Sequence, residues 1–461
     1  MLLLPGMVWG VLALAALVLA FLFAFGYVTL RGYSAPILLA WVLLFPLGYH
    51  FVAFPKDQAI ITLDRILIGL LLFTTFLSKR TNSEPLSNDL RNAALWWILY
   101  VGWALIRVPG GKAPMSAIHI VIDALFLPAV LGWYTVRYFD VRRYLPILHA
   151  LTCIASVYVA GIGFAEILLQ DDLLPVTGGG IVNAGNMFIF LIRPNGPFGS
   201  DNSLAIFGTV SLVFLLFVKN VLGASMPRWQ RALHRIGIAA ALASVLLPLF
   251  RSAMISLAVM FVLDALFFQV GRRRQRRMMV VLAFGFLVLL VRLVLPVIYE
   301  ERTDSYNLFG RVAAYKQTFA LFADNPLTGV GLNNYIDAAQ STKYVTFYQD
   351  VISVDSPHSS VGEVLAETGL IGFVPWLLSQ IFLVRCFWKL RQSKGPDGNT
   401  AWRWFLFAFL GYTINGLTLS IIYSMDVNYW YLFVLMLFYK FGITGNGAAT
   451  GSHAELMSGN L

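Results

Sequence analysis

The chain has 461 residues, of which 59% are hydrophobic and only 12% are charged. A soluble domain carries about 25% charged residues, so this composition excludes an ordinary soluble protein and indicates that lipid surrounds most of the chain. The formal net charge is +10. The two cysteines, Cys153 and Cys386, form neither a CxxC pair nor a zinc-binding spacing, so we expect no disulfide framework and no zinc site.

Apolar segments long enough to cross a bilayer recur along the whole chain. The first, from Met7 to Tyr27, has no basic region before it and is longer than the apolar core of a signal peptide, so we expect a retained helix. The sequence predicts an all-α polytopic membrane helix bundle with 12 or 13 transmembrane helices and no internal repeat. The expected spans are 7–28, 36–54, 60–77, 93–108, 117–135, 145–169, 203–219, 236–250, 252–270, 278–298, 361–388, 402–423 and 427–442.

Basic residues gather in the loops after alternate spans. Short basic loops stay in the cytoplasm, so these loops predict the orientation of the bundle and explain the net charge without a nucleic-acid partner. The basic clusters are Lys79, Arg80 and Arg91; Arg137, Arg142 and Arg143; Lys219, Arg228, Arg231 and Arg235; Arg272, Arg273, Arg274, Arg276 and Arg277; and Lys389, Arg391 and Lys394.

This orientation divides the chain into four parts. Residues 1–298 carry transmembrane helices one to ten, with a Gly-rich periplasmic loop at 170–202. Residues 299–357 form one long helical periplasmic loop, which is a common location for function. C-terminal transmembrane helices follow over 358–442, and we expect a flexible cytoplasmic tail over 443–461.

Three arginines lie on the periplasmic face, against the orientation bias. Arg193 is in a Pro/Gly-rich loop, Arg251 is at a helix junction with apolar flanks, and Arg311 is in the first turn of an expected amphipathic helix whose apolar face carries residues 312, 315, 319 and 322. A guanidinium group fits phosphate oxygens bidentately. The alternatives are an arginine that reaches the membrane interface, pairs with an acid or lies on a solvated loop.

A histidine stands where the long loop meets the membrane. His358 follows Asp355 and precedes Ser359, and an imidazole can take a proton near neutral pH. We expect His358 to activate a hydroxyl group and Asp355 to orient it. Glu367 lies inside the next span, where a carboxylate usually has a partner. An ordinary interfacial histidine and a packing role for Glu367 remain alternatives.

Arginines beside a histidine predict a site for a departing diphosphate and an incoming hydroxyl. The arginines balance the charge on the leaving group, and the histidine deprotonates the acceptor. The outer loops carry neither a DxD-type pair nor a His/Asp cluster, so we expect a metal-independent reaction with no cofactor.

Several short motifs follow one another in the second half of the chain, and weaker ones precede them. The strong motifs are Gly310-Arg311, Asn325-Pro326-Leu327-Thr328-Gly329-Val330-Gly331, Pro357-His358-Ser359-Ser360 and Glu367-Thr368-Gly369-Leu370-Ile371-Gly372; the weaker ones are Gly196 to Ala205, which includes Asn202, and Arg251-Ser252-Ala253. In their order and membrane placement these motifs resemble the O-antigen ligase/polymerase superfamily of membrane glycosyltransferases. The family usually has serine and glycine where this chain has Phe250 and Ser252.

The resemblance implies a GT-C-like fold and an undecaprenyl-diphosphate-linked glycan donor. Arg251 and Arg311, with Arg193, would hold the diphosphate, Asn202 would support the site, and His358 would assist the acceptor, with inversion at the anomeric carbon. Ligases of the family use lipid A–core as acceptor, and polymerases use another lipid-linked glycan. We favour a ligase in the bacterial inner membrane whose site faces the periplasm.

Three readings compete with a ligase, and one of them is a membrane scaffold without activity, which predicts no cavity beneath the 299–357 loop. An O-antigen or exopolysaccharide polymerase would share the chemistry, whereas a lipid or polysaccharide transporter would use intramembrane charges gathered at mid-bilayer. The candidate charges are Asp64, Arg65, Asp123, Glu166, Asp264 and Glu367.

Overall fold

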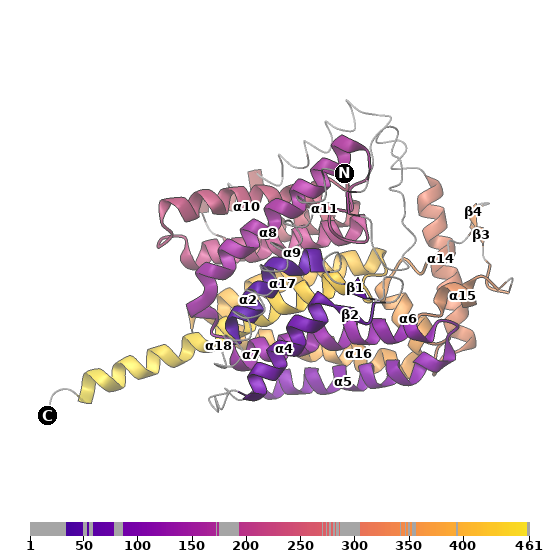
Figure 1. The fold of residues 1–461 in the computed structure, drawn as a ribbon, viewed down its shortest axis with the longest axis horizontal. Helices are drawn as coiled ribbons and strands as arrows, with labels where there is room; N and C mark the ends of the chain where they lie inside the picture. Colours follow the sequence, from indigo (N-terminus) through magenta and orange to yellow (C-terminus); the bar gives the residue numbers. More distant parts are fainter. Residues whose placement is uncertain are drawn as a thin grey trace, which may run out of the picture.

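The computed structural model describes most of the chain as the helical bundle in Figure 1. The described residues are 34–48, 53–54, 59–77, 86–171, 173–174, 193–269, 271–272, 274–275, 278–279, 282, 285, 305–341, 343–345, 347–348, 351–352, 356–392 and 395–458. Two short antiparallel ribbons accompany the helices: β1 (Ala53–Phe54) pairs with β2 (Ile61–Thr62), and β3 (Phe347–Tyr348) pairs with β4 (Val351–Ile352).

Six helical segments of the described chain are long and apolar enough to cross a membrane. They are α5 (Asn88–Arg107) with η2 (Val108–Gly110); α6 (Pro114–His119), η3 (Ile120–Phe126) and α7 (Leu127–Tyr138) as one segment; α8 (Val141–Leu169); α9 (Asp201–Leu222); α11 (Arg251–Leu263) with η4 (Asp264–Phe268); and α16 (Ser360–Gln392). The other bundle helices are α2 (Ala35–Leu44) with η1 (Phe45–Leu47), α4 (Leu63–Leu77), α10 (Arg228–Leu246), α17 (Pro396–Thr418) and α18 (Met425–Ser458).

These helices confirm the all-α polytopic membrane fold. The total of 12 or 13 spans stays a prediction, because span 7–28 and most of 278–298 lie outside the described residues. The division into a long loop and flanking helices also stays a prediction, although the described part of 299–357 is indeed largely helical.

Several boundaries differ from those expected, and the ends of α2 and α18 are two of them. The span expected over 36–54 stops early, because α2 gives way at Phe45 to a 3-10 turn and Ala53 already pairs with Thr62. Pro46 lacks an N–H group for the helical ladder, which a hydropathy pattern does not register. At the other end α18 continues to Ser458, past the boundary expected at 442; no proline interrupts this stretch.

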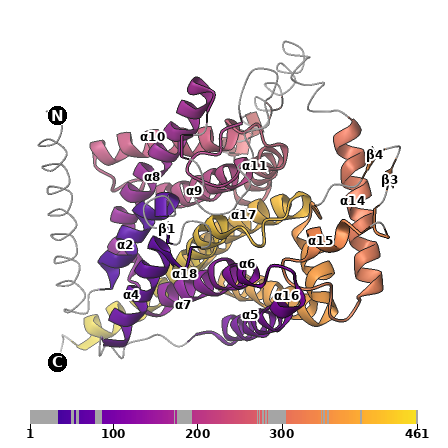
Figure 2. The ribbon, with the colours of Figure 1, turned by 45° about the vertical axis from the view of Figure 1, so that its right-hand side comes forward.

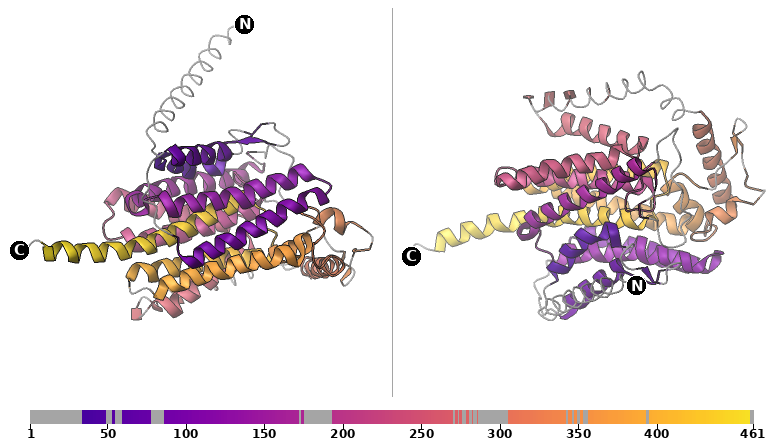
Figure 3. Two further views of the ribbon diagram at one scale, coloured as in Figure 1. Left: turned by 90° about the horizontal axis from the view of Figure 1, so that it is seen from below. Right: turned by 45° about the horizontal axis from the view of Figure 1, so that its top comes forward.

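The long helices run side by side, and one helix crosses their ends. In Figure 1 α5, α16, α17 and α18 lie roughly parallel; α16 packs along α5, and α17 packs along α18. Helix α14 (Ser305–Asp324) stands across the end of this bundle, next to the short helix α15 (Tyr335–Ala339), in Figures 1 and 2 and in the right-hand view of Figure 3. We refer to this end as the α14 end. The core between α9 and α18 is aromatic, with Trp430 packed against Phe207, Phe214 and Phe433.

A break in α16 fits around the turn that follows α14. Gly369, with φ +61° and ψ −167°, interrupts the helix and leaves backbone groups on both sides without helical partners. The turn 326–331 supplies these partners, and we term the turn and the break together the glycine clamp. Its four main-chain bonds run from Val330 N–H to Ala366 O (2.9 Å), Gly331 N–H to Glu367 O (3.0 Å), Leu370 N–H to Pro326 O (2.9 Å) and Ile371 N–H to Leu327 O (3.1 Å).

The two sides of the clamp approach so closely because both carry glycine. A Cβ atom on Gly329 would lie 2.3 Å from the carbonyl carbon of Glu367, and one on Gly369 would lie 2.3 Å from the carbonyl oxygen of Leu327. Both glycines also have a positive φ, which other residues adopt only with strain. The glycines at these positions of the sequence motifs are therefore required by the fold.

Helix α5 satisfies further carbonyl groups at the clamp. Trp103 Nε1–H donates to the carbonyl of Thr368 at 2.8 Å, and the Arg107 guanidinium donates to the carbonyl of Gly329 at 3.1 Å. These bonds tie the clamp to the membrane bundle and keep its broken backbone hydrogen-bonded inside an apolar environment.

We expect Gly369→Ala to destabilise the protein by about 2–3 kcal/mol, because the new methyl group strains the backbone and collides with the turn. Thermal unfolding followed by tryptophan fluorescence measures the change. Gly102→Ala in α5 is the matched control, since a Cβ atom there meets nothing within 4 Å, and its effect should stay within about 1 kcal/mol. If the two variants unfold at the same temperature, the close backbone approach at Gly369 does not stabilise the protein, and the role given to the glycine clamp is wrong.

Candidate active site

His358 lies immediately before α16 in a strained conformation. Its φ is +46°, which is uncommon for any residue except glycine and persists only where the surroundings impose it. The side chain is half-buried. Burial lowers the pKa of His358, and the positive charge of Arg311 lowers this pKa further. The imidazole is therefore neutral at neutral pH and able to accept a proton.

Ser360 anchors the first turn of α16 directly after this histidine. Its hydroxyl donates to the carbonyl of Leu419 at 3.0 Å and accepts the N–H of Ile421 at 2.9 Å. Both partners belong to the loop between α17 and α18. The backbone on the C-terminal side of His358 is thus fixed to the bundle.

Arg311 approaches His358 from α14. The sequence predicts this arginine in the first turn of its helix, but α14 begins at Ser305 and places Arg311 in the second turn. The helix extends further back because Phe309 packs on Tyr348, with ring centroids 5.5 Å apart. Among the described residues no carboxylate forms an ion pair with Arg311.

Tyr315 joins α14 to the ends of two membrane helices. Its hydroxyl donates to the carbonyl of Leu417 at 3.2 Å, with the carbonyl of His358 3.5 Å away. One side chain, four residues after Arg311, thus holds α14 against both the last turn of α17 and the backbone of His358.

Helix α11 meets the same end of α17. Arg251 is its first residue and is exposed, and the hydroxyl of the next residue, Ser252, donates to Asn415 Oδ1 at 2.6 Å. Asn415 lies two residues before Leu417, the partner of Tyr315. The structure therefore gathers Arg251, Arg311 and His358 around the C-terminal turn of α17 at the α14 end.

Arg193 and Asn202 lie before and within the first turn of α9. Arg193 pairs with Asp201 at 3.2 Å, which partly balances its charge, and Asn202 Oδ1 is buried without a hydrogen-bond partner in the described chain. The N–H of Gly196 donates to the Glu166 carboxylate at 2.8 Å and orders this loop. No ion pair or hydrogen bond of the described residues joins Arg193 or Asn202 to the histidine, so their roles in the site stay predictions.

The structure describes only one of the two acids that were expected to support the site. Asp355 lies outside the described residues. Glu367 is buried, and its two carboxylate oxygens accept the N–H groups of Asn333 (3.0 Å) and Tyr335 (3.1 Å). It therefore holds the start of α15 against α16, which is the structural partner that an intramembrane carboxylate requires.

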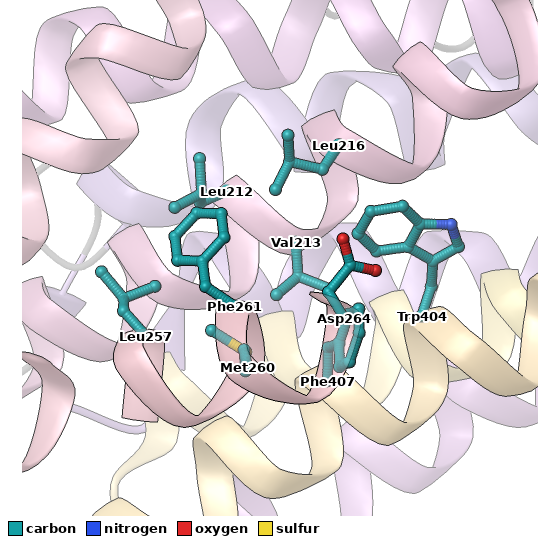
Figure 4. A pocket seen from close by; sticks show the side chains of 9 residues that line it. All are labelled: Leu212, Val213, Leu216, Leu257, Met260, Phe261, Asp264, Trp404 and Phe407. Carbon is teal, nitrogen blue, oxygen red and sulfur yellow. The ribbon is translucent and has the colours of Figure 1, made fainter. Parts of the chain in front are cut away.

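An apolar crevice opens along the helix that begins with Arg251. Figure 4 shows its lining from α9, α11 and α17, in which Asp264 is the only charged side chain. The lining residues are Leu212, Val213, Leu216, Leu257, Met260, Phe261, Asp264, Trp404 and Phe407. The Asp264 carboxylate pairs with Arg403, so the charge is balanced inside the protein.

Sequence reasoning missed Tyr315 and Asn415. Tyr315 counted only as a member of an apolar face, although its hydroxyl stands one turn after Arg311. Asn415 is a polar side chain inside an expected span, and such a residue normally needs a partner within the bundle. That requirement is the signal by which Asn415 could have been found.

Arg311→Gln should raise the pKa of His358, because removal of a nearby positive charge favours the imidazolium form. NMR titration of histidine-labelled protein measures this pKa, and His358→Gln assigns the signal among the six histidines of the chain. Arg193→Gln, whose charge is paired with Asp201, should leave the pKa in place. If the pKa of His358 does not change in Arg311→Gln, the two side chains do not interact, and this would contradict their closeness in the site.

Comparison with known proteins locates the family within this part of the chain. Residues 236–377 match the family model described as O-antigen ligase. The matched region contains Arg251, Arg311, His358 and both sides of the glycine clamp, whereas Arg193 and Asn202 precede it. No curated protein matches the chain. The match over residues 236–377 supports the resemblance of this chain to the O-antigen ligase/polymerase superfamily.

Proposed function

We propose that this protein transfers a glycan from undecaprenyl diphosphate to a hydroxyl group of lipid A–core at the periplasmic face of the bacterial inner membrane. The observation that carries the proposal is that the Tyr315 hydroxyl, one turn after Arg311, is bonded to the carbonyl of Leu417 and lies 3.5 Å from the carbonyl of His358, so the charge of Arg311 acts on the His358 imidazole. The basic loops at the opposite ends of the membrane helices support the orientation.

The chemistry follows from these groups. The acceptor oxygen attacks the anomeric carbon opposite the diphosphate, and the proton of the acceptor hydroxyl passes to the imidazole of His358. The bond between the anomeric carbon and the diphosphate oxygen breaks, and its electron pair leaves with that oxygen. Guanidinium groups of Arg251 and Arg311 balance the growing charge, a role worth about 3–4 kcal/mol per well-placed donor. Attack from the opposite side inverts the anomeric centre, as in a GT-C-type transferase.

The apolar crevice marks an apolar stretch of α11 beyond Arg251. Its α11 lining begins at Leu257, six residues after Arg251, and reaches Phe261, ten residues after it. At a rise of 1.5 Å per residue this stretch lies about 9–15 Å along the helix from the arginine. The crevice encloses only about 20 Å³ and therefore does not hold a polyprenyl chain, so in this proposal the apolar chain of the donor lies in the bilayer.

The intramembrane charges favour transfer over transport. A transport pathway needs polar groups that exchange partners, whereas all six candidate charges are engaged by the fold. Their contacts are Asp64 with Trp41 Nε1 (2.8 Å), Arg65 with Asp123, Glu166 with Gly196 N–H (2.8 Å), Asp264 with Arg403, and Glu367 with the N–H groups of Asn333 and Tyr335. A polymerase of the same superfamily would share the chemistry and differ in its acceptor.

His358→Ala and Arg311→Ala should each reduce glycan transfer by about 10²–10³-fold while the protein still inserts and melts normally. The assay combines purified protein, a polyprenyl-diphosphate glycan and a panel of acceptors, with and without a chelator, which should have no effect. Lys343→Ala is the control, because Lys343 is exposed beside α14 and pairs only with Asp324 and Tyr344. Transfer at the wild-type rate in both site variants would overturn the proposed roles.

The pH dependence of glycan transfer tests whether His358 acts as the general base. Only the neutral imidazole accepts a proton, so kcat/KM is high above the pKa of His358 and falls as the pH drops through it. Because the pKa of His358 lies below the ordinary value of 6.5, the acid-side midpoint should also lie below 6.5. A midpoint above that value, with an acceptor that does not titrate in the range, would argue against His358 as the base.

A further inference from the structure

Helix α14 exposes one large apolar ring while it buries other side chains. Phe319 is 68% exposed, whereas Leu321, Ala313 and Ala314 are buried against the rest of the protein. A helix that faces water usually carries polar residues on its outer side. The exposed ring of Phe319 is therefore a point at which α14 can contact an apolar environment outside the protein.

The same surface continues into the clamp turn and α15. Leu327 is 60% exposed and Ile336 is 54% exposed. The carbonyl of Leu327 accepts the N–H of Ile371 in α16, and Leu370 and Ile371 are themselves 40% and 43% exposed on that membrane-spanning helix. The outward apolar surface is thus continuous with the lipid-facing side of the bundle.

We propose that Phe319, Leu327 and Ile336, together termed the apolar ridge, insert into the bilayer interface at the α14 end. Helix α14 crosses the ends of the membrane helices (Figures 1 and 2), which is the orientation of a helix lying in a membrane surface. The occupant is lipid, because two of the three ridge residues, Leu327 and Ile336, are aliphatic and because Leu327 adjoins the exposed Ile371 of the membrane-spanning helix α16.

The anchor has a consequence for the site, and this step rests on the proposed function. Arg311 lies in the same helix as Phe319, and Tyr315 between them is bonded to α17 beside the backbone of His358. Contact of the ridge with lipid therefore sets the height of Arg311 and His358 relative to the phosphates of the bilayer. A lipid-linked diphosphate then meets Arg311 without leaving the headgroup layer.

Site-directed spin labels test the anchor in nanodiscs of phosphatidylethanolamine and phosphatidylglycerol, without donor or acceptor. Labels at Phe319→Cys, Leu327→Cys and Ile336→Cys should show an oxygen-to-nickel-chelate accessibility ratio several-fold above that at Lys343→Cys, an exposed control on the same unit. Unmutated protein gives the labelling background of the two native cysteines, which are buried. Ratios equal to that of the control at all three positions would overturn the proposal.

Two further experiments distinguish the proposed membrane contact of the apolar ridge from the proposed glycan transfer. Protection of the three labels that appears only after lipid A–core is added would make this surface an acceptor site and overturn the anchor. Phe319→Asn with Ile336→Asn should lower transfer in nanodiscs several-fold, whereas Lys343→Asn should not. A lipid-like accessibility ratio in a protein without transfer activity would leave the anchor standing and remove the proposed function alone.

Discussion

The glycine clamp is the constraint on which the arrangement of the site depends. Helix α14 ends at Asp324, directly before the clamp turn, and α16 begins two residues after His358. The helix that carries Arg311 and the helix that follows His358 are therefore both positioned by one contact between two stretches of backbone. Each of its hydrogen bonds contributes only about 0.5–1.5 kcal/mol, but glycine at Gly329 and Gly369 lets all four form together in an apolar setting.

The membrane helices and the candidate site residues could be predicted from the sequence for the same reason. Polar and charged side chains are unfavourable inside the bilayer, so their positions mark both the ends of the helices and the residues that need a special role. Arg311 and His358 stand out because the first lies within, and the second at the end of, a polar loop between apolar spans. Other features depend on partners that no local pattern encodes. The stripe at 312, 315, 319 and 322 has a clear helical period, but the period does not say whether protein or lipid covers it. Likewise, a hydropathy average does not distinguish Pro46 from its apolar neighbours. It therefore predicts a helix that continues past the point where α2 ends.

Charged side chains of this bundle differ in what balances them. Asp123 and Asp264 are buried, and each lies in a π-helical turn, a widened geometry found often at special sites. Each pairs with an arginine, Arg65 or Arg403, and such pairs serve the fold. Arg311 is half-buried and forms no ion pair with a described carboxylate. In the proposed function, the diphosphate of the donor balances its charge.

That difference gives donor binding a direct effect on the base. The positive charge of Arg311 lowers the pKa of His358 in the free protein, which keeps the imidazole neutral but also makes it a weaker base. A diphosphate that rests on Arg311 cancels part of this charge, so the pKa of His358 rises towards its ordinary value. The histidine is then neutral before the donor arrives and more basic once the leaving group is in place. In the proposed function, the electrostatics of these two side chains therefore couple donor binding to activation of the acceptor.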